Sequence, residues 1–171
     1  MIQKPKAGCL TNSLSVGDKA PLFSLPASNG EIISLKDFQG KNTVVLYFYP
    51  KDDTPGCTVE ACEFRDDVKS FTKHKAIVLG VSPDSVASHD KFIKKFNLPF
   101  LLLSDETKQT CQDYGVWIEK SMYGRKYMGV ARTTFVIDKN GTIVEKFCKV
   151  KPVGHAAEVL EALKSSCLPW Q

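Results

Sequence analysis

The pattern of apolar positions predicts three strands that are buried on both faces. Residues 43–49 (TVVLYFY) form a continuous run of β-branched and aromatic side chains. Residues 76–81 (AIVLGV) repeat this pattern, and residues 100–103 (FLLL) form a shorter run of the same kind. A strand with one wet face alternates apolar and polar residues, whereas a strand inside a parallel sheet is apolar throughout. We therefore expect a parallel sheet with both faces covered.

The segments between these runs show the periodicity of helices. Helices are expected over residues 55–73 and 85–96, the second with Val86 and Ile93 on one apolar stripe. Right-handed crossovers make the strands of such a βαβαβ order parallel, and sheets of this kind carry their chemistry at the carboxyl ends of the strands. The stretch PKDDTPGC begins at such an end.

Two Asn-Gly steps predict β-hairpins on either side of this core, because Asn-Gly favours the positive φ angles of tight turns. One hairpin is expected within residues 21–35, and another joins residues 133–138 to residues 142–147. An amphipathic helix over residues 154–166 follows. This order predicts an α/β thioredoxin-like fold, with a central mixed β-sheet flanked by helices and an added N-terminal β-hairpin.

Length and composition favour a single domain over residues 1–171, with residues 1–14 as a flexible N-terminal extension. The net charge of +4 is spread along the chain without a basic run, so the electrostatic footprint of a nucleic-acid-binding protein is missing. The longest apolar stretches have about eight residues, far fewer than the roughly 20 that cross a bilayer. No membrane or nucleic-acid partner is therefore expected.

The N-terminal segment lacks the apolar region of a secretory signal, so the expected compartment is the reducing cytoplasm, where a cysteine pair is more often catalytic than structural. Thr54 is a favourable N-cap, Pro55 suits the first helical position, and Gly56 follows. Cys57 then falls within the first turn, where unpaired N–H groups and the helix dipole favour an anion. Cys57 is thus placed to be a nucleophile.

Cys62 lies further along the same predicted helix, on its polar face. At about 100° per residue, its side chain points about 140° away from that of Cys57, and the two Cα atoms are roughly 8 to 9 Å apart. A disulfide needs a separation of less than about 7 Å. A bond between the two sulfurs therefore requires the first turns to unwind.

Other interpretations of the cysteine pair are less well supported. The two residues could be unreactive thiols that happen to share a helix. A zinc site would need a second pair at ligand spacing, and the chain has no Cys-x-x-Cys oxidoreductase motif. The placement at a helix start favours a nucleophile and a second thiol that reaches it after a conformational change.

Pro50, Thr54 and Cys57, in the pattern Pro-x-x-x-Thr-x-x-Cys, resemble the active-site motif of the peroxiredoxins. The surrounding FYPKDDTPGCTVEACEFRD resembles the bacterioferritin comigratory protein or PrxQ branch in particular, and the likeness extends from Val16 to the final helix. The resemblance implies a thioredoxin fold in which Cys57 is the peroxidatic cysteine and Cys62 is the resolving cysteine.

The resemblance also implies roles for the side chains around Cys57. Thr54 would hydrogen-bond the sulfur and the peroxide, Pro50 would shield the site from water, and Arg132 would stabilise the thiolate and the transition state. A guanidinium suits that role because it stays charged and offers several fixed donors. Glu60 is expected either to orient Arg132 or to be a plain exposed helix charge.

The remaining polar residues are not expected to take part in the chemistry. Asp52 and Asp53 are interpreted as solvated loop charges. Cys111 and Cys148 are expected to be packed or half-buried thiols, and each histidine is expected on a helix surface or in the core. The histidines are His74, His89 and His155, and the cysteines near the termini, which have no supported role, are Cys9 and Cys167.

The predicted function is that of a thiol-specific peroxidase for hydrogen peroxide and organic hydroperoxides, in antioxidant defence and cell redox homeostasis. Cys57 would become a sulfenic acid, Cys62 would condense with it, and thioredoxin or a similar dithiol would reduce the disulfide. No metal or organic cofactor is needed, and a monomer is expected. The alternative is a peroxide sensor or holdase on the same fold, while protein disulfide exchange is opposed by the missing Cys-x-x-Cys.

Overall fold

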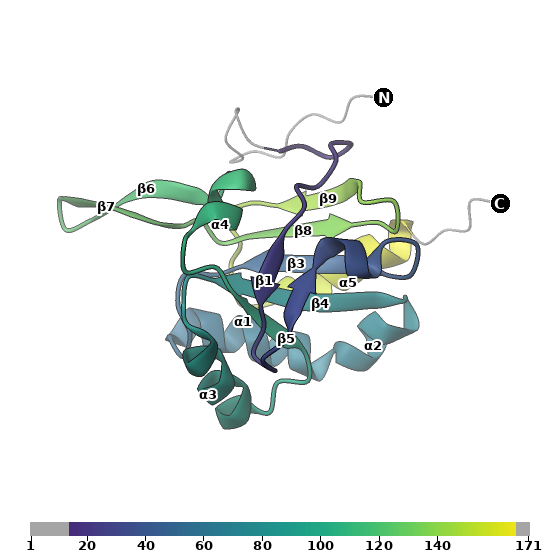
Figure 1. Ribbon diagram of the computed structural model, residues 1–171, viewed down its shortest axis with the longest axis horizontal. Coiled ribbons are helices and arrows are strands. Elements are labelled where there is room, and N and C mark those ends of the chain that lie inside the picture. The colour runs from purple at the N-terminus through teal and green to yellow at the C-terminus, as the bar shows by residue number, and fades with distance from the viewer. Residues whose placement is uncertain (1–13, 167–171) are drawn as a thin grey trace.

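A five-stranded mixed β-sheet forms the centre of the structure, a computed structural model that describes residues 14–166 (Figure 1). The strands are β3 (Thr43–Phe48), β4 (Ala76–Ser82), β5 (Leu101–Ser104), β8 (Thr133–Ile137) and β9 (Ile143–Phe147). They lie in the order β5-β4-β3-β8-β9. β3, β4 and β5 are parallel, whereas β8 is antiparallel to β3 and β9 is antiparallel to β8. The three apolar runs therefore form the parallel part of the sheet, as predicted.

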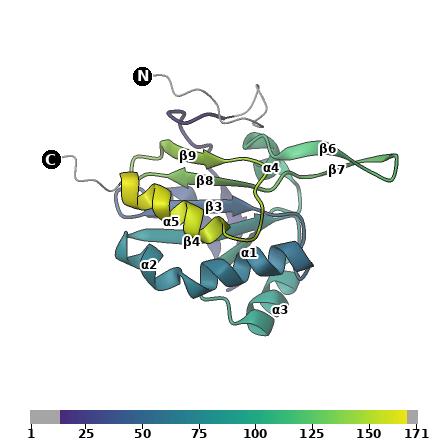
Figure 2. The same ribbon diagram turned by 180° about the vertical axis from the view of Figure 1, so that it is seen from behind.

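Helices cover the face of the sheet that is turned to the viewer in Figure 2. The helices that pack on this face are α1 (Pro55–Asp66), α2 (Val68–Lys73), α3 (Val86–Phe96) and α5 (His155–Ser166). Phe64 of α1, Phe71 of α2 and Phe92 of α3 meet side chains of β3 in one apolar cluster. Within residues 55–73, an apolar stripe that includes Phe64 and Phe71 thus faces the sheet.

The opposite face carries the predicted N-terminal hairpin and two short helical segments. The hairpin pairs β1 (Ser24–Pro26) with β2 (Ile32–Ser34), and Gly30 in its turn has a φ of +85°, which favours glycine. η1 (Leu35–Phe38) and α4 (Gln109–Asp113) complete this layer. Their buried side chains form a second apolar cluster with those of β3. The sheet is therefore covered on both faces.

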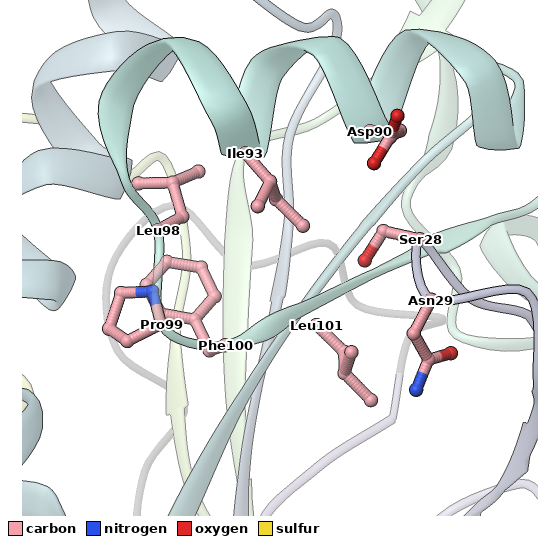
Figure 3. Close-up of a pocket in the computed structure, with 8 residues that line it drawn as sticks. All are labelled: Ser28, Asn29, Asp90, Ile93, Leu98, Pro99, Phe100 and Leu101. Atoms are coloured by element: carbon pink, nitrogen blue, oxygen red, sulfur yellow. The ribbon is translucent and has the colours of Figure 1, made fainter.

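The turn of the N-terminal hairpin lies beside β5 and α3. The Ser28 N–H donates to the carbonyl of Leu102 at 2.9 Å. Figure 3 shows a pocket at this place, with Ser28 and Asn29 on one side and Asp90 and Ile93 of α3 on another. None of the site residues predicted from the sequence lines this pocket.

Three features differ from the sequence predictions. The helix expected over residues 55–73 is broken at Asp67, whose φ of −99° and ψ of 5° separate α1 from α2. The sequence does not predict α4, nor the hairpin of β6 (Trp117–Met122) and β7 (Arg125–Val130). This hairpin projects from the body of the molecule (Figure 1). Most of its side chains are exposed, so it lacks the alternation of a strand with one buried face.

Some of the sequence predictions concern residues that the structure does not describe. The N-terminal extension expected over residues 1–14 lies outside the described residues except for Leu14, and so do Cys9 and Cys167. Between residues 14 and 166, no helix combines the length and the apolar character that a membrane span needs.

Candidate active site

The loop between β3 and α1 carries the predicted active-site motif. Half-buried Pro50 lies in this loop, and Thr54 is the N-cap of α1 with an extended backbone. The Thr54 hydroxyl donates to the carbonyl of Lys51 at 2.9 Å and does not cap a helix N–H. Because its proton is committed to the backbone, the hydroxyl oxygen offers lone pairs to a ligand at the start of the helix.

Cys57 lies in the first turn of α1, and the residue is only 1% exposed. It belongs to the apolar cluster that contains Tyr47, Tyr49 and Phe64. The rings of Tyr47 and Phe64 stack with their centroids 4.9 Å apart. A thiolate in this position gains little from bulk water, so its stabilisation depends on the helix N-terminus and on specific donors.

Arg132, directly before β8, supplies such a donor. Its Nη2 donates to Cys57 Sγ at 3.4 Å, and its Nη1 donates to Glu60 Oε1 at 3.0 Å. Burial acts to lower the pKa of Arg132, but the neighbouring Glu60 and Cys57 outweigh burial and raise it. The guanidinium therefore stays positively charged and is held in place beside the sulfur.

Gly56 allows this close approach. A Cβ atom at this position would lie 3.2 Å from Arg132 Nη2 and 3.3 Å from Cγ of Pro152. Contacts this short would push the guanidinium away from the start of α1. The absence of a side chain between Pro55 and Cys57 is thus part of how Arg132 reaches the sulfur.

Glu60 is buried, with only 1% of the residue exposed. The alternative of a plain exposed helix charge is therefore wrong, and the expected contact with Arg132 is present. Its second carboxylate oxygen, Oε2, is buried and has no hydrogen-bond partner among the described residues. Burial raises the pKa of Glu60 to about 7, against the opposing effect of Arg132.

Cys62 lies on the same helix, half-buried, and both it and Cys57 are free thiols. Since α1 is continuous through both residues, helix geometry keeps their Cα atoms roughly 8 to 9 Å apart. Beyond Cys62, the Glu63 carboxylate accepts the N–H of Gly154 at 2.9 and 3.0 Å, which ties α1 to the start of α5. A disulfide requires the N-terminal turns to unwind.

A sequence profile of the AhpC/TSA family matches residues 16–146 of the chain. Peroxiredoxin Bcp of Bacillus subtilis is 49% identical over 152 residues, which are 89% of this chain and 96% of the relative. The chain is a peroxiredoxin of the AhpC/TSA family. Peroxiredoxin Bcp of Escherichia coli resembles this peroxiredoxin similarly, with 47% identity over 90% of the chain and 97% of the relative.

Solved structures refine the position of the peroxiredoxin within the family. A PrxQ of Xylella fastidiosa has a TM-score of 0.85 and 40% identity, covering 90% of this chain and 97% of that one. The bacterioferritin comigratory protein of Xanthomonas campestris has a TM-score of 0.80 and 42% identity, covering 84% and 91%. These likenesses confirm the thioredoxin-like fold and the Bcp/PrxQ branch. The peroxiredoxin is accordingly an oxidoreductase with peroxidase activity.

The raised pKa of Glu60 predicts a pH-dependent stability of the peroxiredoxin. Because this pKa rises from 4.5 to about 7, the folded state holds the proton more tightly, and the resulting stabilisation is lost as the pH rises through about 7. We expect the free energy of unfolding of Glu60→Gln, relative to the wild type, to increase by roughly 3 kcal/mol between pH 4.5 and 8. Denaturant titrations at fixed pH measure this difference, and a constant difference would contradict the prediction.

The interpretation of Asp52 as a solvated loop charge is wrong. The residue is 7% exposed, and its carboxylate lies 2.7 Å from the imidazole of His89. Asp53 is exposed, as expected, and pairs with Lys95 at 2.7 Å. The sequence holds one signal of the contact between Asp52 and His89. His89 falls on the apolar stripe of the helix predicted over residues 85–96, and a buried polar side chain needs a hydrogen-bond partner.

Four further cysteines and histidines lie within the described residues. Cys111 is a buried free thiol, as expected, and burial together with Asp105 raises its pKa. Cys148 is half-buried as expected, but the expectation of a thiol is wrong because Cys148 is disulfide-bonded. His155 is buried, and burial lowers its pKa to about 4, so its imidazole is neutral near pH 7. His74 is half-buried at the end of α2.

Proposed function

We propose that this peroxiredoxin reduces hydrogen peroxide and organic hydroperoxides with the Cys57 thiolate as the nucleophile. The observation that carries the proposal is the contact of 3.4 Å between Arg132 Nη2 and Cys57 Sγ, in the first turn of α1. A fixed guanidinium and a helix N-terminus both favour a buried sulfur anion. The Xanthomonas campestris relative is described for its alkyl peroxide reduction activity, which supports organic hydroperoxides as substrates.

In the first step, the Cys57 thiolate attacks the terminal, hydrogen-bearing oxygen of the hydroperoxide. The S–O bond forms as the O–O bond breaks, and the leaving alkoxide or hydroxide takes up a proton to become an alcohol or water. The sulfur is oxidised to a sulfenic acid while the peroxide is reduced by two electrons. Arg132 donors stabilise the charge as it moves from the sulfur to the leaving oxygen.

The β3–α1 loop completes the pocket for the peroxide. The oxygen of Thr54, whose own proton goes to the Lys51 carbonyl, accepts the O–H of the hydroperoxide. Pro50 covers the site and keeps water from the sulfur. Glu60 orients the guanidinium of Arg132 through its contact of 3.0 Å.

In the second step, α1 opens and the Cys62 thiolate attacks the sulfenic sulfur. An S–S bond forms, the S–O bond breaks, and the oxygen leaves as water after protonation. Thioredoxin or a similar dithiol then reduces the disulfide by thiol exchange, and α1 closes again. The two free thiols on different faces of one continuous helix support this order of events.

Peptide mass spectrometry after one equivalent of hydrogen peroxide tests the proposed pair. We expect a disulfide between Cys57 and Cys62 in the wild type and in Cys111→Ser, because the Cys111 thiol is buried. In Cys62→Ser, the sulfenic acid of Cys57 should persist and react with dimedone, while turnover with thioredoxin stops. A disulfide from Cys57 to any other cysteine would assign the resolving role elsewhere.

A further inference from the structure

A buried hydrogen-bond network, to which the proposed function gives no role, holds the loop that precedes Cys57. Asp52 Oδ2 lies 2.7 Å from His89 Nδ1 and accepts the hydroxyl of Ser88 at 2.8 Å. Asp52 Oδ1 accepts the phenol O–H of Tyr49 at 2.6 Å. The side chains of His89 and Asp52 are 0% and 4% exposed, so water does not compete for these contacts.

Three polar atoms face the ring nitrogens of His89, from Leu103, Asp52 and Tyr49. Nε2 lies 3.0 Å from the carbonyl oxygen of Leu103, which can only accept, so Nε2 carries a hydrogen. Nδ1 lies 2.7 Å from Asp52 Oδ2, while the Tyr49 hydroxyl oxygen lies further away, at 3.4 Å. The imidazole therefore connects the β3–α1 loop, through Asp52, to the backbone of β5.

The conformation of the loop needs such support. Asp53 has a φ of 57°, in the left-handed region that few non-glycine residues adopt. Its ion pair with Lys95 is exposed on both sides and contributes little. The Asp52 N–H donates to Asp84 Oδ2 at 2.8 Å, just before α3. The buried contacts of Asp52 are thus the principal attachment of the loop to α3 and to the segment before it.

We propose that His89 is a positioning residue for the peroxidase reaction. Through Asp52, it holds the β3–α1 loop with Thr54 against the start of α1, in the closed arrangement in which Cys57 attacks peroxide. Loss of this contact favours the opened arrangement in which Cys62 reaches the sulfur. The inference rests on the proposed function of the two cysteines and assigns His89 control of the balance between the two steps.

A metal site does not account better for this cluster. Ligand atoms of Asp52, Asp84 and His89 lie within 4.8 Å of one another. However, these atoms already have hydrogen-bond partners. His89 Nδ1 contacts the Asp52 carboxylate, and Asp84 Oδ2 accepts the Asp52 N–H and, at 2.7 Å, the hydroxyl of Ser82. A metal ion would have to displace these contacts.

Two substitutions of His89 separate its two ring nitrogens. His89→Asn keeps a side-chain N–H close to the position of Nδ1, whereas His89→Gln keeps one close to Nε2 only. In His89→Gln, we expect the rate constant for oxidation of Cys57 by hydrogen peroxide to fall about 10- to 100-fold. The rate of disulfide formation after oxidation should rise. His89→Asn should recover most of both rates, and His74→Asn, a matched change elsewhere, should leave them unchanged.

The opposite direction of the two changes is the signature of positioning. Rapid-mixing measurements follow sulfenic acid formation and disulfide formation separately in each variant. Equal effects of His89→Gln and His89→Asn, or a slowing of both steps together, would overturn the inference. Either result would indicate a general loss of packing, which affects both variants and both steps alike. If His89→Gln does not fold, Ser88→Ala serves instead, because it removes one donor to Asp52. We expect its oxidation rate constant to fall and its rate of disulfide formation to rise, each about threefold. Unchanged rates would then overturn the inference.

The same experiment separates this inference from the proposed function. If the wild type forms no sulfenic acid at Cys57, the proposed function fails. If the wild type reacts as proposed but both His89 variants keep its two rates, only the positioning role of His89 fails.

Discussion

Replacing Cys57 by serine is expected to lower peroxide consumption coupled to thioredoxin by about 1000-fold or more. A serine hydroxyl is not ionised near neutral pH, so the variant lacks the anion that attacks the O–O bond in the proposed mechanism. The smaller oxygen fits the buried site, and the ion pair between Arg132 and Glu60 remains to hold the neighbourhood together. Steady-state oxidation of NADPH with thioredoxin and its reductase measures the loss.

Cys111→Ser is the matched control for this substitution. It removes another buried free thiol at a distance from the β3–α1 loop, in α4 on the other side of the sheet. Turnover should stay at the wild-type level in this variant. Steady-state turnover that is unchanged in Cys57→Ser would exclude Cys57 as the attacking residue.

Replacing Arg132 by methionine is expected to lower the rate constant for oxidation of Cys57 by about 100- to 1000-fold. The variant loses the charge beside the Cys57 sulfur and, on the proposed mechanism, the donors that stabilise the leaving oxygen. Arg132→Lys should lose less, about tenfold, because it keeps the charge but not the fork that contacts Cys57 and Glu60 together. Competition with a peroxidase of known rate constant measures each variant.

A second variant separates the chemical role of Arg132 from its contribution to stability. Removing the guanidinium alone leaves Glu60 buried without its partner, which is costly if the carboxyl group is charged. The double variant Arg132→Met, Glu60→Gln removes this penalty. We expect it to recover stability but to remain slow, and a recovery of the rate would show that the loss in Arg132→Met came from the unpaired carboxyl group.

Local patterns predict the sheet and its covering helices well. Two of the apolar runs, within residues 43–49 and 76–81, lie side by side as parallel strands. Their side chains are buried on both faces, which is why the apolar pattern predicts them. The break at Asp67 is not predicted, because the apolar stripe continues across it from Phe64 to Phe71. The β6–β7 hairpin is missed for the opposite reason, since it buries too little to leave a periodic pattern.

Within the candidate site, local sequence patterns predict some residues, whereas others depend on contacts between distant parts of the chain. Thr54 and Cys57 are placed by local rules for the start of a helix. The contact of Cys57 with Arg132 spans 75 positions and is expected only from the family resemblance. The burial of Asp52 depends on His89, 37 positions away, and no rule for loops predicts it. Long-range partners decide whether a loop carboxylate is solvated or buried.

If α1 opens as proposed, the break at Asp67 limits how much of the structure must unwind in each catalytic cycle. The helix α1 ends there, and just beyond Cys62 the side chain of Glu63 is tied to Gly154. Unwinding that brings the two sulfurs together therefore needs only about two helical turns. We expect α2 to stay folded during this unwinding, because Phe71 anchors it in the apolar cluster. On the proposed mechanism, the segment that opens is small. We therefore expect the melting temperature of the rest of the fold to depend little on the redox state of the cysteine pair.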